Sequence, residues 1–139
     1  SKGLIEKCKE DLKISYLGHK NAIKTYLTPI ENLELLFNDV EIKLAYEWLH
    51  KFNLSHVQDE LAASLSFGQQ KKLALIRVLA KSPELIVLDE PFVGLDQITA
   101  GQLNNFLDKK LSEGAGLIFT SHINPKIDCR VLDLEAKNV

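Results

Sequence analysis

The chain has 139 residues, of which 45% are hydrophobic and 26% are charged, and these values match one globular domain rather than a disordered or fibrous protein. The formal net charge of -2 gives no overall basic field of the kind that attracts nucleic acid or anionic lipid nonspecifically. No apolar stretch reaches the roughly 20 residues that a membrane-spanning helix needs.

The N-terminal stretch and the cysteines indicate a cytoplasmic protein. The first residues lack the apolar core of a signal peptide. Cys8 and Cys129 are far apart, and neither has a second cysteine at metal-binding or redox spacing, so we expect reduced thiols, with a disulfide as the alternative. Any attachment to a membrane is therefore expected to go through a partner protein.

The first half of the chain predicts one strand followed by helices. Residues 12–17 alternate with period two, which is typical of a half-buried strand, here ending at Gly18. Apolar residues then recur mostly at helical spacing over residues 30–50, with an interruption near Asn38 and Asp39, and a short helix is expected at residues 56–62. We interpret this part of the chain as a helical insert.

The second half predicts alternating helices and strands. Within residues 68–82, a run is apolar around nearly the whole helical circumference, which indicates a buried helix that stops at Pro83. The apolar run at residues 85–88 is typical of a strand covered on both faces in a parallel sheet. A helix at residues 97–112 and strands at residues 116–120 and 130–134 follow. This order predicts an α/β fold.

Two adjacent carboxylates are the strongest chemical feature. Asp89 and Glu90 follow the buried strand, at the end where ligands of open α/β sheets bind. Such a pair suits phosphoryl transfer, in which Asp89 holds Mg²⁺ directly or through water and Glu90 polarises the water that attacks a terminal phosphate. The alternative is a strand followed by a solvated acidic turn.

A second feature stands before the long buried helix, in the sequence Leu-Ser-Phe-Gly-Gln at residues 65–69. Ser66 can cap the helix, and a helix N-terminus beside a small residue can bind phosphate through its free N–H groups. A capping serine is common, so this feature is weak by itself. Its value comes from its combination with Asp89 and Glu90.

Together these motifs resemble the ATP-binding cassette (ABC) family of ATPases. Residues 65–69 resemble the family's LSGGQ signature, and Asp89-Glu90 resembles its Walker B motif. Gly94-Leu95-Asp96 resembles the D-loop, and His122, which without this context would read as an ordinary loop histidine, resembles the switch histidine that contacts the γ-phosphate. The resemblance extends from Ile14 onward.

The resemblance implies a partial ABC-type P-loop NTPase core, with a mostly parallel sheet, flanking helices and a helical signature subdomain. Residues 1–28 and 83–139 would belong to the nucleotide-binding core, and residues 29–82 to the helical subdomain. It also implies ATP and Mg²⁺ as cofactors, and a homodimer of ATPase subunits on a transmembrane permease. In that dimer Ser66, Gly68 and Gln69 would act on the partner's nucleotide, Asp96 would serve nucleotide binding, and no nucleic acid would be bound.

The phosphate-gripping sequence Gly-x-x-x-x-Gly-Lys-Ser/Thr, the Walker A motif, does not occur in the chain. Residues 1–5 resemble the stretch that follows the first helix in family members, so the chain is expected to start just beyond the phosphate loop. We therefore expect the chain alone to be inactive, because nothing in it neutralises the β- and γ-phosphates.

His19 stands where most family members have the Q-loop glutamine. Gly18-His19 and the sequence at residues 23–33 resemble the ATP-binding subunit of the bacterial cytochrome c maturation (haem exporter) system. Imidazole can replace the amide as a hydrogen-bonding group, and the alternative is a surface histidine without a role. This resemblance implies a peripheral protein at the cytoplasmic face of the inner membrane, with the permease near residues 20–31.

Two other functions stay open. A cassette ATPase for another substrate fits the motifs but does not account for Gly18-His19. A soluble ABC ATPase that acts on nucleic acid ranks last, because that class needs coiled-coil arms or duplicated cassettes, and the sequence has neither heptads nor repeats.

Overall fold

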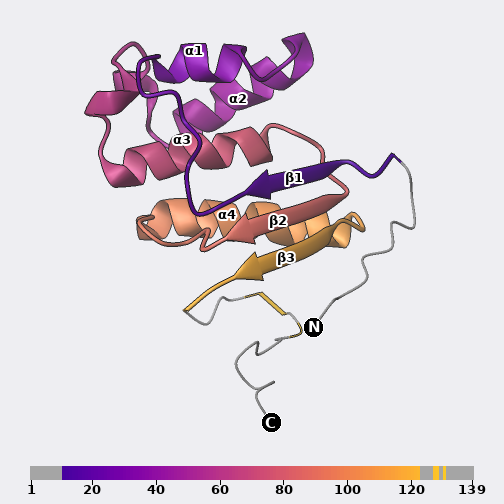
Figure 1. Ribbon diagram of the computed structural model, residues 1–139. Coiled ribbons are helices and arrows are strands. Elements are labelled where there is room, and N and C mark those ends of the chain that lie inside the picture. Colours follow the sequence, from indigo (N-terminus) through magenta and orange to yellow (C-terminus); the bar gives the residue numbers. More distant parts are fainter. Residues whose placement is uncertain (1–10, 123–126, 129, 131–139) are drawn as a thin grey trace, which may run out of the picture.

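A computed structural model describes residues 11–122, 127, 128 and 130. In these residues a parallel three-stranded sheet forms the centre of the protein (Figure 1). The strands lie in the order β1 (Ile14–Leu17), β2 (Leu85–Asp89) and β3 (Gly116–Thr120). In the register of the sheet Leu17 lies beside Leu88, and Asp89 lies beside Thr120. The carboxyl ends of all three strands therefore meet at one edge, and the predicted α/β fold with a parallel sheet is confirmed.

The expectation that β2 is covered on both faces is wrong for the described residues. Ile86 and Leu88 are buried, but Leu85 and Val87 are only partly so. Figure 1 shows α4 behind the sheet and no described helix in front of it. The side chains on that front face are correspondingly open.

The burial of β1 shows the same asymmetry. This strand is half-buried as predicted, yet its buried side chains are Ser15 and Leu17, whereas Ile14 is 53% and Tyr16 69% exposed. The helices contact the sheet from the side of Ser15 and Leu17, with α3 lying against β1. Alternation alone predicts one buried face but does not say which face other elements will cover.

Two helices follow the first strand, and their starts are encoded locally. Helix α1 (Pro29–Glu34) begins after a capping box formed by Thr28 and Glu31, and α2 (Asp39–Lys51) begins after an equivalent box formed by Asn38 and Glu41. In each box the cap side chain and the third helical residue satisfy backbone N–H groups reciprocally. The predicted interruption near Asn38 is thus confirmed as a helix boundary.

The helix expected at residues 56–62 does not form. Two 3₁₀ turns, Ser55–Val57 and Ala62–Ser64, occupy this part of the chain. The backbone N–H groups of Ala62 and Ala63 bond instead to the carbonyls of Leu27 and Thr25, at 2.9 and 3.0 Å. These long-range bonds attach the segment to the loop after β1, and they replace the local bonds that a helix needs.

Two further helices pack on the sheet. Helix α3 (Phe67–Leu79) provides buried apolar side chains on most of its circumference, as predicted, although it ends before Ser82 because the chain turns at Ala80, ahead of Pro83. Helix α4 (Gln97–Ser112) has the predicted bounds. No helix in the described part of the chain is long and apolar enough to cross a membrane. The expected strand beyond Arg130, residues 1–5, Cys8 and Cys129 lie outside the described residues.

Candidate functional site

The two adjacent carboxylates are organised by Thr120 at the end of the neighbouring strand. The Thr120 hydroxyl donates to Asp89 Oδ1 at 2.6 Å, and Thr120 Oγ1 itself accepts the backbone N–H of Glu90 at 3.0 Å. One side chain therefore orients the Asp89 carboxylate and anchors the peptide that follows it. This arrangement is possible because parallel pairing of β2 and β3 places residues 89 and 120 side by side.

Glu90 has a strained backbone and a histidine partner. Its φ of +46° lies in the left-handed region, which is rare for a residue with a side chain and is concentrated at functional sites. His122 Nε2 lies 3.2 Å from Glu90 Oε1, and the histidine side chain is 93% exposed while the glutamate is 17% exposed. The glutamate is thus held in place, and the imidazole remains open to a ligand.

These groups line a cavity of about 590 Å³ at the carboxyl edge of the sheet. We call it the carboxylate cavity, and its lining consists of His19, Phe67, Lys71, Asp89, Glu90, Val93, Thr120, Ser121 and His122. Histidines from two separate loops, after β1 and after β3, reach it together with both carboxylates. A volume of this size is within the range of small-molecule sites.

The donor set of the cavity fits magnesium delivered with a phosphate ligand. Asp89 uses Oδ1 for Thr120, and in the described part of the chain no contact occupies its Oδ2. The described residues contain no group of three or more His, Cys, Asp or Glu side chains that could hold a metal ion. Mg²⁺ typically takes one or two carboxylates and completes its shell with water and phosphate oxygens, so Asp89 can serve as its protein ligand.

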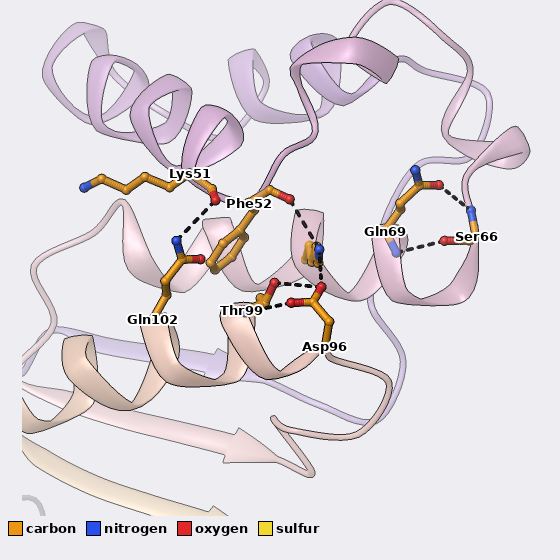
Figure 2. Close-up of polar contacts among 8 residues, drawn as sticks. Lys51, Phe52, Ser66, Gln69, Asp96, Thr99 and Gln102 are labelled. Carbon is orange, nitrogen blue, oxygen red and sulfur yellow. Dashed lines mark hydrogen bonds and ion pairs between the residues drawn. The ribbon is translucent and has the colours of Figure 1, made fainter.

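The start of α3 is closed by a capping box (Figure 2). Ser66 Oγ accepts the backbone N–H of Gln69 at 3.2 Å, and Gln69 Oε1 accepts the backbone N–H of Ser66 at 2.8 Å. Ser66 is the N-cap that the sequence predicts. Gln69 is the reciprocal partner, which the pattern Ser-x-x-Gln indicates.

Gly68 and Gly94 bring the start of α3 against the loop before α4. A Cβ atom added to Gly68 would lie 2.9 Å from the carbonyl oxygen of Gly94, closer than real Cβ atoms approach backbone. Gly94 itself has a φ of +80° and lies under the ring of Phe67. Both positions therefore require glycine, for close approach at Gly68 and for backbone conformation at Gly94.

Asp96 is engaged within the fold through both carboxylate oxygens. As the N-cap of α4 it accepts the Thr99 backbone N–H at Oδ1 and the Thr99 hydroxyl at Oδ2, at 2.8 and 3.0 Å. Lys72 Nζ pairs with Oδ2 at 2.6 Å and also donates to the carbonyl of Phe52 at 3.4 Å. The Lys72 ammonium, then the Thr99 N–H, lowers the pKa of Asp96 to about 2.

We call Ser66, Gln69, Lys72, Asp96 and Thr99 the capping cluster. Figure 2 shows its two parts, the Ser66 and Gln69 box and the Asp96 network, with Gln102 donating to the carbonyl of Lys51 beside them at 3.3 Å. Lys72 therefore joins α3 to the start of α4 and to the end of α2, and Gln102 joins α4 to the end of α2.

The sequence-predicted residues thus fall in two places. The carboxylate cavity contains His19, Asp89, Glu90 and His122, whereas Ser66, Gly68, Gln69 and Asp96 do not line it. Sequence reasoning missed Thr120 and Lys71. The signals available were a hydroxyl that ends a strand two residues before His122, and a lysine within a helix whose other inward residues are apolar.

Comparison with known proteins gives a consistent family. Residues 3–93 match the family model described as ABC transporter. The chain is 37% identical to the cytochrome c biogenesis ATP-binding export protein CcmA of Idiomarina loihiensis, over 79% of this chain and 51% of that protein. It is 32% identical to the lipopolysaccharide export system ATP-binding protein LptB of Haemophilus influenzae, over 78% of this chain and 48% of that protein.

The fold agrees with solved cassettes. The structure is similar to a dimeric ATP-binding cassette, MJ0796, in a post-hydrolysis state bound to ADP and Pi, with a TM-score of 0.67, 28% identity, and coverage of 81% of this chain and 53% of that chain. The chain spans about half the length of the curated relatives it matches. Those relatives belong to two different export systems at nearly equal similarity, so they support the family without selecting a substrate.

Proposed function

Because this chain belongs to the ABC transporter family, we propose that it is part of an ATP-binding, ATP-hydrolysing subunit that drives a transmembrane permease. The observation that carries the proposal is the carboxylate cavity, where Asp89 and Glu90 lie at the carboxyl end of the central strand and His122 contacts Glu90. Ligands of open α/β sheets bind at this edge. The subunit would work as a peripheral protein at the cytoplasmic face of the bacterial inner membrane.

The residues of the cavity have separate roles in this proposal. Asp89 holds Mg²⁺, which when bound neutralises charge on the phosphates. Glu90 orients the attacking water, and its strained backbone and contact with His122 fix where its carboxylate points. The exposed imidazole of His122 contacts the terminal phosphate. His19, across the same cavity, takes the part of the Q-loop glutamine.

The start of α3 serves the nucleotide of a second subunit. A helix N-terminus favours anions, and Ser66, Gly68 and Gln69 form the first turn of α3 outside the carboxylate cavity. Asp96 supports the same contact from the start of α4. The dimeric arrangement of MJ0796, a cassette of the same fold, supports a homodimer of this kind.

In this proposal the chain divides into three consecutive segments that form two structural parts. Residues 1–28 and 83–139 form the nucleotide-binding core, and residues 29–82 form the helical subdomain. The pairing of β1 with β2 across this insert supports the division, because strands 14–17 and 85–89 form one sheet although the insert separates them. The ring of Trp48 in α2 packs edge-on against Phe106 in α4, with centroids 5.7 Å apart, so the two parts are in contact.

For the transported species, we propose haem-related export in c-type cytochrome biogenesis. Gly18-His19 and the similarity to CcmA support this substrate. The similarity to LptB favours a second candidate, a cassette ATPase for another exported substrate. Introducing the complete subunit into a strain that lacks its cytochrome c biogenesis ATP-binding protein separates them. Restored haem-stained c-type cytochromes support the first candidate, and failure by a stably expressed subunit supports the second.

Glu90→Gln tests the catalytic assignment. In the complete subunit with its membrane partner, this change removes the base without changing size, and we expect ATP hydrolysis to fall by about 10² to 10⁴-fold. Hydrolysis at the wild-type rate would exclude Glu90 from this role. The 139-residue chain alone is expected to be inactive, and turnover by it that Glu90→Gln abolishes would contradict that expectation.

A further inference from the structure

Lys71 is a buried lysine whose place in the fold the proposed function does not use. It lies in the second turn of α3 and is 4% exposed, and its side chain lines the carboxylate cavity. The neighbouring Lys72 is different, because it pairs with Asp96 and donates to the carbonyl of Phe52. Helix α3 therefore supplies two lysines, Lys72 to the capping cluster and Lys71 to the carboxylate cavity.

The ammonium group of Lys71 has no partner in the described part of the chain. No hydrogen bond or ion pair joins it to any residue among 11–122, 127, 128 and 130. Burial lowers the pKa of Lys71, and attraction by Asp89 and then Glu90 opposes that change. The charged groups that share its cavity are these two carboxylates, and the histidines there are His19 and His122.

Lys71 is 4% exposed and its side chain reaches the cavity, so its ammonium group is partly desolvated and a compensating charge nearby is favourable. The field of Asp89 and Glu90 provides it at longer range than an ion pair. Conversely, two adjacent carboxylates repel one another, and a nearby positive charge reduces that repulsion. The same charge also repels any divalent cation that approaches the pair.

We propose that Lys71 is a positioning residue whose ammonium group acts as counter-cation to the Asp89 and Glu90 pair and weakens divalent-cation binding while no nucleotide is present. This rests on the proposed function, since it takes Asp89 as the magnesium ligand. It adds a link that runs within one subunit. Helix α3, whose N-cap Ser66 is proposed to contact the nucleotide of the second subunit, also places Lys71 near Asp89 and Glu90 of its own subunit.

The test is Mn²⁺ binding to the nucleotide-free full chain, measured by electron paramagnetic resonance of the free ion. Lys71→Met replaces the side chain by an uncharged one that is shorter by one atom, and Lys71→Gln is a second neutral variant. We expect both to bind Mn²⁺ roughly threefold to tenfold more tightly than the wild type. Lys71→Arg, which keeps the charge, should bind as the wild type does.

Two control variants separate the possible failures. Lys43→Met removes an exposed lysine of α2 that does not line the cavity, and it should leave Mn²⁺ affinity unchanged. Asp89→Asn should abolish binding. If Mn²⁺ binding survives Asp89→Asn, the magnesium assignment of the proposed function fails. If Asp89→Asn abolishes binding but the neutral Lys71 variants bind no more tightly than wild type, or no variant binds detectably, only the role of Lys71 is overturned.

Discussion

The carboxylate cavity and the capping cluster both take residues from the first two turns of α3, and they treat their polar groups differently. In the capping cluster both oxygens of Asp96 and the reciprocal pair of Ser66 and Gln69 are engaged within the fold. In the cavity, His122 is almost fully exposed and Lys71 has no partner among the described residues. The capping cluster satisfies its polar side chains within the fold, whereas the cavity leaves some polar side chains open to a ligand.

Among the variants that test this difference between the cavity and the capping cluster, we expect Thr120→Val to have the largest effect. The change keeps the shape of the side chain but removes the hydroxyl that bonds Asp89 and the N–H of Glu90. We expect ATP hydrolysis by the complete subunit to fall by about tenfold to 100-fold, because the catalytic carboxylates lose their orientation. Thr120→Ser should keep most of the activity. Equal rates for Val and Ser would show that the hydroxyl does not position the pair.

Lys72→Met tests the capping cluster through stability. This variant leaves Asp96 without its cation and frees the carbonyl of Phe52, and we expect a loss of about 1–2 kcal/mol in the free energy of unfolding. Chemical denaturation measures the change, with Lys43→Met as the exposed control. Lys72→Met and Lys71→Met should differ in kind, since only the second is expected to change Mn²⁺ affinity. A shared phenotype would remove the distinction between the two regions.

Ser66→Ala and Thr28→Ala form a matched pair at two capping boxes. Each removes one N-cap, so each should lower stability by about 1 kcal/mol. Only Ser66 lies in the proposed contact with the second subunit's nucleotide. Of the two changes, we therefore expect only Ser66→Ala to weaken ATP-dependent dimerisation of the complete subunit. Sedimentation velocity measures this, with Glu90→Gln also present in both variants so that bound ATP is not hydrolysed. Equal dimerisation of the two variants would leave Ser66 with a capping role alone.

The pH dependence of stability in acid tests the Asp96 network, with a smaller expected change in the free energy of unfolding. The folded pKa of about 2 lies below the usual value of 3.8, so the charged form stabilises the fold. That contribution is complete above about pH 4 and is lost as the pH falls through 2. The half-exposed carboxylate limits it to under about 1 kcal/mol. Asp96→Asn should flatten this part of the stability profile. An unchanged slope would contradict the assignment.

His19 gives the smallest expected difference. His19→Gln restores a hydrogen-bonding side chain at the cavity and should hydrolyse ATP at close to the wild-type rate, whereas His19→Ala should be slower. Steady-state hydrolysis by the complete subunit measures both. Identical rates for the two variants would make His19 a bystander on the cavity wall.

Several elements could be predicted from the sequence because their causes are local. The bounds of α4 follow from Asp96 as its cap and from helical spacing, and the break at Asn38 follows from its capping box. The strand before Asp89 follows from an apolar run that ends in two carboxylates. Each signal lies within a few residues, where backbone hydrogen bonds and caps decide the structure.

The sequence by itself therefore determined the α/β order, the family resemblance and the positions of Asp89 and Glu90. Tertiary structure decided which face of β1 is buried, why residues 56–62 form turns, and that Thr120 holds the carboxylates. These features depend on contacts between segments far apart in the chain. The two partners of such a contact never lie within a few residues of each other in the sequence. Thr120 reaches Asp89 only because β2 pairs with β3 in the folded sheet.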